Sequence, residues 1–386
     1  MVKRAITLGG GGPAAGLHIG VLEALEAHPE IEFKVWSLSC IGAWVGIVYN
    51  QCDQGWEVEQ TYDFFKKNVF RDDVSYSRFP INAAFGTDWF GNARALMAFA
   101  SDYRNFQNLW LPDRIMDSYR ETLTLLLDQG KWNEGDINQW FLNHVLAPNP
   151  LVRYLSSSMY LSNVTGLSRI HYPDSTFMKR INFDRLKEVS RPTIIHNAWN
   201  LDRQKLELFS NRGNKYKPIT PASLCACSAL PFVECTVEID GNAYCEGALV
   251  DTVNFKDLLK DHPKLDEIWV SRIVDAQQVR KPENLHDNLA NLCQLFAATV
   301  GEDDVKLFEY HVKKEKDWRG TIIEIGVDSR INFNWSHDNL EQGRKCGYEA
   351  AGRAYKKYIK KTNGKPNKTG RVKIIDAVHR AHNPRA

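Results

Sequence analysis

Residues 35–46 read VWSLSCIGAWVG, a stretch that combines the pattern of a strand with that of a helix. Its first part is an apolar run that predicts a buried strand, and the run ends abruptly at Ser39-Cys40. A small-residue segment that favours a helix begins at Ile41. A strand that turns sharply into a helix around one nucleophilic side chain is a nucleophile elbow, for which the usual pattern is G-x-S-x-G. Here the five residues are LSCIG, so Cys40 occupies the serine position and Leu38 the position of the first glycine. A buried core cysteine remains the alternative interpretation of Cys40.

A glycine-rich loop precedes the elbow by about thirty residues. A buried strand is expected over residues 5–8, followed by GGGGPAAG at residues 9–16 and a helix over residues 17–27. Exposed backbone N–H groups beside a helix N-terminus favour a negative charge. Such a loop can form either an oxyanion hole or a dinucleotide site. The dinucleotide alternative needs an acidic residue at the end of the second strand, and that strand ends in Leu38-Ser39 instead. A purely structural glycine turn is a third possibility.

The composition is that of a globular protein. The chain has 386 residues, of which 43% are hydrophobic and 25% charged, with a formal net charge of +2. A nearly neutral balance gives no case for a nucleic-acid partner. No apolar run reaches about 18 residues, and the N-terminal apolar segment is too short for a signal peptide. The eight scattered cysteines are typical of reduced, buried thiols, and Cys225-x-Cys227 lacks the spacing of a zinc site. We therefore expect a cytoplasmic protein without a metal or cofactor.

The segment from residue 54 to about 190 is rich in aromatic residues. Helices are expected over residues 114–128 and 136–146, between irregular segments. Such an insertion could cover a pocket for an apolar chain, or it could be a second small helical core.

Strands return after residue 192. The runs 193–198 and 206–210 are expected to pair, and 237–239 and 243–245 flank Asp240-Gly241-Asn242, a hairpin signal. The second hairpin strand leads into EGALVD at residues 246–251. Further strands are expected at 267–271 and 321–327, and helices at 285–314 and 339–359. The last segment, residues 353–386, holds eleven Lys or Arg and one acid. Such a segment either contacts an anionic membrane surface or is a solvated end.

Taken together, these stretches resemble the patatin-like phospholipase family. The resemblance rests on the glycine loop, the elbow, GLHIGVLEAL at residues 16–25, CSALPF at 227–232 and EGALVD at 246–251, all in the family's order and spacing. It implies a three-layer α/β/α sandwich with a central, mostly parallel sheet and a helical, aromatic-rich insertion. We expect an α/β domain over residues 1–275, with the insertion at about 54–190. A C-terminal extension packed on the core would span 276–360, and a basic tail 361–386.

The resemblance also implies a Ser–Asp dyad that hydrolyses acyl esters, usually of lipids, through an acyl-enzyme. This sequence departs at both positions, because Cys40 replaces the serine and Glu246 the aspartate. The implied site is Cys40 as nucleophile, Glu246 as base, and the amides of Gly10, Gly11 and Gly12 as the oxyanion hole. Asp251 is expected to hold the turn after Glu246, and His18 and His196 to be structural.

Three functions stay open at this point. The first is an acyl hydrolase or acyltransferase with an active Cys40–Glu246 pair; Cys40 could also be a substitution in a serine enzyme. The second is a catalytically silent module of the same fold that binds lipid or a protein. The third is a flavin or nicotinamide oxidoreductase. The sequence does not give the acyl chain, the head group, the acyl acceptor or the oligomeric state.

Overall fold

The computed structural model describes residues 2–78, 85–87, 89–103, 106, 112–127, 134–146, 149–161, 164–170, 175, 177–213, 215–272, 278–315, 318–327, 332–367 and 372–376. The chain forms two compact units. Unit 1 comprises residues 1–86 and 170–386, and unit 2 comprises residues 87–169.

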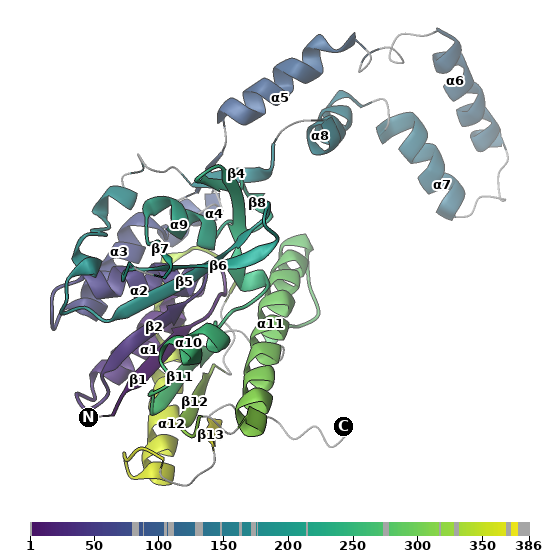
Figure 1. Ribbon diagram of the computed structural model, residues 1–386. Helices are drawn as coiled ribbons and strands as arrows, with labels where there is room; N and C mark the ends of the chain where they lie inside the picture. Colours follow the sequence, from purple (N-terminus) through teal and green to yellow (C-terminus); the bar gives the residue numbers. More distant parts are fainter. Residues whose placement is uncertain are drawn as a thin grey trace. The chain divides into compact units, whose positions relative to one another are not determined.

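The core of unit 1 is a mostly parallel sheet (Figure 1). Six strands run parallel, in the spatial order β13 (Lys373–Asp376), β12 (Thr321–Gly326), β11 (Glu267–Arg272), β1 (Arg4–Leu8), β2 (Phe33–Leu38) and β5 (Thr193–Asn200). The antiparallel hairpin of β10 (Asn242–Glu246) and β9 (Val237–Ile239) continues the sheet beyond β5. β6 (Lys205–Ser210) also pairs antiparallel with β5, as expected, and β7 (Lys217–Pro218) pairs with β6. Two short strands, β3 (Phe85–Thr87) and β8 (Phe232–Glu234), lie outside this sheet.

Helices cover both faces of this sheet, because alternate residues of each buried strand point to opposite faces. One hydrophobic cluster joins Ile6 of β1 to α1 (Ala15–Glu26), α2 (Ile41–Gln51), α3 (Glu57–Asn68), α9 (Pro221–Cys227) and α12 (His337–Thr362). A second cluster joins the neighbouring Ala5 to α10 (Phe255–Asp261) and α11 (Leu285–Glu315). The short helix α4 (Asp73–Arg78) follows α3. The architecture is the expected three-layer α/β/α sandwich.

Unit 2 is mostly helical. It contains α5 (Trp89–Ser101), α6 (Pro112–Leu127), α7 (Glu134–Phe141) with a π-helical continuation (Leu142–Leu146), and α8 (Pro150–Leu161), followed by β4 (Gly166–Ile170). Within it, Phe99 packs edge-on against Tyr154, and the Trp140 indole donates to the Thr122 hydroxyl (3.2 Å). The two helices expected in this segment are thus present as α6 and α7. Its role as the cover of an acyl pocket stays a prediction.

Two further sequence features have a clear structural outcome. The predicted hairpin turn is present, with positive φ at Asp240 (50°) and Gly241 (71°). Residues 373–376 of the basic C-terminal segment form β13 at the edge of the sheet. Among the described helices, none has the length and apolar character required to cross a membrane.

Candidate active site

Cys40 lies at a tight turn between β2 and α2. It is the residue before the first turn of α2. Its backbone has φ 49° and ψ −125°, a conformation that residues other than glycine rarely adopt. The next turn leaves no room for a side chain at Gly42, where a Cβ would lie 2.2 Å from the carbonyl oxygen of Leu8. The Ser39 N–H donates to that same oxygen (3.0 Å). Residues 38–42 therefore have the geometry of a nucleophile elbow although the first glycine of the pattern is absent.

Glu246 ends β10 and contacts Cys40. Both residues are buried, with 7% and 8% of their surfaces exposed, and the thiol donates a hydrogen bond to the carboxylate. Burial raises the pKa of Glu246 to about 7. Burial, together with the negative charge of Glu246, raises the pKa of the Cys40 thiol well above its ordinary range. At neutral pH the pair therefore consists of a thiol and a partly ionised carboxyl group, and a thiolate is not formed in advance.

The glycine loop passes beside this pair. A Cβ at Gly10 would lie 3.2 Å from the Cβ of Cys40 and 3.7 Å from Oε1 of Glu246. In the described part of the chain, the N–H groups of Gly10, Gly11 and Gly12 donate no hydrogen bond. Free amides next to a nucleophile are what an oxyanion hole requires.

His18 fixes the start of that loop. One ring nitrogen bonds the carbonyl oxygen of Gly9 (2.9 Å) and the other bonds the Ser271 hydroxyl (3.0 Å). Complete burial lowers the pKa of His18 to about 4, so the ring is neutral at pH 7. His196 is equally buried and bonds the Ser223 hydroxyl (3.1 Å). Both histidines are structural, as expected.

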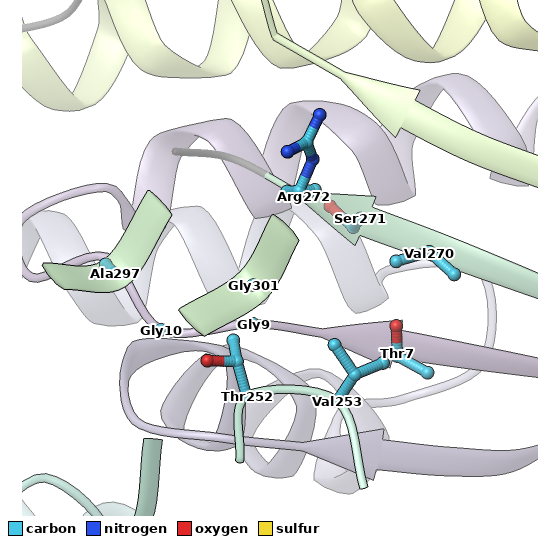
Figure 2. A pocket seen from close by; sticks show the side chains of 10 residues that line it. All are labelled: Thr7, Gly9, Gly10, Thr252, Val253, Val270, Ser271, Arg272, Ala297 and Gly301. Atoms are coloured by element: carbon cyan, nitrogen blue, oxygen red, sulfur yellow. The ribbon is translucent and has the colours of Figure 1, made fainter. Parts of the chain in front are cut away.

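A small cavity of about 10 Å³ lies behind the loop. Figure 2 shows Gly9 and Gly10 close to Thr252 and to two small residues of α11, Ala297 and Gly301. The volume suffices for at most one water molecule, so it is too small for an acyl chain.

Two residues near Cys40 have roles that sequence patterns did not indicate. The Sγ of Cys227, expected only to be a buried thiol, accepts the N–H of Cys40 (3.1 Å). Asn197 bonds both to Ser39 and to the loop after Glu246. A polar amide in the middle of a buried core strand was the available signal for Asn197. Asp251 holds the turn after Glu246 as expected, since its Oδ1 accepts the N–H groups of Val253 (2.9 Å) and Asn254 (2.6 Å). Within the described residues, no group of His, Cys, Asp and Glu side chains could hold a metal ion.

Comparisons with known proteins assign the chain to a family. The model of the family described as patatin-like phospholipase matches residues 6–259. Among solved structures, VipD from Legionella pneumophila is similar, with a TM-score of 0.42 and 12% sequence identity over 92% of this chain and 67% of VipD. The search of curated proteins gave no match. The family match covers well over half of the chain and includes the glycine loop, the elbow and Glu246. The chain belongs to the patatin-like phospholipase family.

Proposed function

We propose that the chain is an acyl hydrolase that cleaves acyl esters, lipids among them, with Cys40 as nucleophile and Glu246 as base. The observation that carries the proposal is the convergence of three separate segments. The elbow, the end of β10 and the glycine loop bring Cys40, Glu246 and Gly10 into contact. The same convergence argues against the dinucleotide alternative, because Gly10 of the loop lies against both Cys40 and Glu246.

The chemistry proceeds in two half-reactions. In the first, the Glu246 carboxylate takes the thiol proton while Sγ of Cys40 forms a bond to the ester carbonyl carbon. The carbonyl oxygen becomes negatively charged, and the amides of Gly10, Gly11 and Gly12 stabilise it. The carbon–oxygen bond to the alcohol then breaks, and Glu246 gives its proton to the leaving oxygen. The product on the enzyme is a thioester.

In the second half-reaction, water replaces the alcohol. Glu246 takes a proton from water as its oxygen attacks the thioester carbon. The carbon–sulfur bond breaks, the proton returns to Cys40, and the free acid leaves. An alcohol in place of water would make the reaction an acyl transfer, so the acceptor is a matter for experiment.

The raised pKa of Cys40 supports one alternative. A buried thiol beside a carboxylate is a poor source of thiolate, so a silent module that binds lipid or a protein partner is the second candidate. Covalent labelling of Cys40 by an activated acyl donor separates the two, since only the hydrolase forms the thioester. Contact of the basic C-terminal segment with an anionic membrane also stays a prediction.

The test is hydrolysis of p-nitrophenyl esters of several chain lengths by the parent protein and by Cys40→Ala, Cys40→Ser and Cys52→Ala. Cys52 is a matched control, because it is a buried thiol directly after α2 whose Sγ donates to the Val48 carbonyl (3.0 Å). We expect Cys40→Ala to lose at least about 100-fold in kcat and Cys52→Ala to stay near the parent. An inert parent with an active Cys40→Ser would identify a serine enzyme carrying a cysteine. Four inert proteins would contradict the proposal for these esters and favour the binding module.

A further inference from the structure

Asn197 is a buried amide that bonds to both halves of the candidate site. Its surface is fully covered, and it lies on β5. Its Oδ1 accepts the hydroxyl of Ser39 (3.3 Å), the residue before Cys40. Its Nδ2 donates to the carbonyl oxygen of Asp251 (2.6 Å) and to Oδ1 of Asn254 (2.9 Å), in the loop that follows Glu246.

The main chain around Asn197 adds two contacts of the same kind. A Cβ at Gly247, directly after Glu246, would lie 2.6 Å from Oδ1 of Asn197, so the backbone passes against the amide. On the other side, the backbone N–H of Asn197 bonds to the thiol of Cys227. That thiol also accepts the N–H of Cys40 (3.1 Å).

The topology of the sheet explains why such a link is needed. Cys40 follows β2 and Glu246 ends β10, and these strands are not neighbours, because β5 lies between them. The distance from the thiol to the carboxylate therefore depends on how both segments are held to β5. An asparagine has one acceptor oxygen and two donor hydrogens at the required length, and all three take part here. Loss of a buried amide also leaves its former partners unsatisfied.

We propose that Asn197 is a positioning residue that sets the separation of Cys40 and Glu246 by binding the elbow and the Asp251–Asn254 loop at the same time. Its catalytic consequence rests on the proposed acyl hydrolysis, but its effect on the geometry of the pair does not.

The geometric test is the pH dependence of Cys40 alkylation by iodoacetamide, followed by peptide mass spectrometry because the chain has eight cysteines. In the parent, Glu246 contributes to the raised pKa of Cys40. In Asn197→Ala, we expect the alkylation midpoint to move about one pH unit towards that of an ordinary thiol. The matched control is Asn200→Ala, since Asn200 is on the same strand, equally buried, and donates to Glu207 (3.2 Å) and Tyr244 (3.0 Å). Its midpoint should equal that of the parent.

The catalytic test uses the same variants on the best ester found for the parent. We expect Asn197→Ala to lower kcat at least about 10-fold with KM nearly unchanged, because misplacement of the base affects the chemical step. Asn200→Ala should change neither constant. A parent without hydrolase activity would contradict the proposed function, and the alkylation experiment would still decide the role of Asn197.

Two milder variants keep the test valid if Asn197→Ala does not fold. Ser39→Ala removes only the bond to the elbow. Asn254→Gly removes one of the two bonds to the loop, leaves the bond to the Asp251 carbonyl, and accommodates the φ of 56° at this position. Each should shift the midpoint in the same direction as Asn197→Ala and by less. Midpoints at the parent value in every variant that folds would overturn the proposal.

Discussion

At the scale of single residues, the backbone of Cys40 is the costly feature. Residues held in sparsely populated conformations cost on the order of 1–3 kcal/mol and persist only where the surroundings determine them. Here the Ser39 N–H bonds the Leu8 carbonyl, and the Cys40 N–H bonds the Cys227 thiol, so the turn is held on both sides. The conformation points the thiol at Glu246 and leaves Gly10 as its nearest neighbour in the loop.

The first prediction concerns Gly10→Ala. The added Cβ would lie 3.1 Å from that of Ala248 and 3.2 Å from that of Cys40, so it crowds the place where an ester carbonyl must bind. We expect ester hydrolysis to fall about 10- to 100-fold while the free energy of unfolding changes by less than about 1 kcal/mol. The control is Gly213→Ala, where no atom lies within 4 Å of the new Cβ. Equal activities of the two variants would contradict the placement of the substrate beside Gly10.

The sequence was sufficient to predict which segments come together around Cys40 but not the contacts that support them. Cys40, Glu246 and Gly10 each lie in a local pattern, a strand end or a glycine loop, that can be recognised from neighbouring residues. The bonds of Asn197 and Cys227 to the elbow join residues more than 150 positions apart. Local periodicity carries no information about such partners.

At the scale of elements, the closest packing is between α1 and α12. Two glycines of each helix lie in the seam, and the backbones touch there. A Cβ at Gly20 would lie 1.8 Å from the carbonyl oxygen of Arg344, and one at Gly347 would lie 2.0 Å from that of Leu17. Arg344 also binds Glu23 of α1 through two hydrogen bonds (2.7 and 3.0 Å). The sequence predicted a helix over residues 339–359, but only the structure shows that its partner is α1.

The second prediction concerns Gly347→Ala. The methyl group cannot enter the seam unless the helices separate, so we expect the free energy of unfolding to fall by about 1–3 kcal/mol. Gly352 lies on the same helix with no atom within 4 Å of a new Cβ. Gly352→Ala should therefore stabilise the protein by about 0.5–1 kcal/mol through helix propensity alone. Denaturant unfolding measures both changes in the free energy of unfolding. If both variants were stabilised, or both destabilised, the result would contradict the close packing of α12 on α1 at Gly347.

At the scale of the whole molecule, a pair of carboxyl groups makes stability depend on pH. Asp304 of α11 accepts the N–H of Thr252 (2.7 Å) and bonds the side chain of Asp251. Burial, then the neighbouring Asp251, raises the pKa of Asp304 to about 7, and burial raises that of Asp251. Asp257 and Asp303 add further negative charge. Since the folded state retains a proton that the unfolded state loses near pH 4, stability from this pair is complete below pH 4 and is lost as the pH rises through 7.

The third prediction follows from this loss of stability as the pH rises. In Asp304→Asn, the amide can donate to Asp251 at every pH, so the loss of stability between pH 5 and pH 8 should be smaller than in the parent. We expect the variant to match the parent at pH 5 and to exceed it at pH 8 by an amount on the order of 1 kcal/mol. Asp303→Asn is the comparison for the loss of one nearby negative charge, because that exposed neighbour lies on the same helix and acts on Asp304 through its charge; its pH dependence should change less than that of Asp304→Asn. Stability is measured by thermal unfolding at each pH. If the stability of the parent and of Asp304→Asn changed equally with pH, the result would contradict a proton held between Asp251 and Asp304.

The seam between α1 and α12 also has a consequence for how the protein is made. The first residue of α12, His337, leaves the ribosome 311 positions after the last residue of α1, Glu26. Since synthesis adds about 5–20 residues per second, roughly 15 to 60 s pass between the synthesis of α1 and that of the helix that covers its glycine face. β1 likewise lacks β11 until residue 272 has been added. The nascent chain therefore exposes one edge of β1 and the glycine face of α1 until β11 and α12 have been synthesised. We expect a chaperone that holds early apolar segments to increase the yield of folded protein more than one that acts after release.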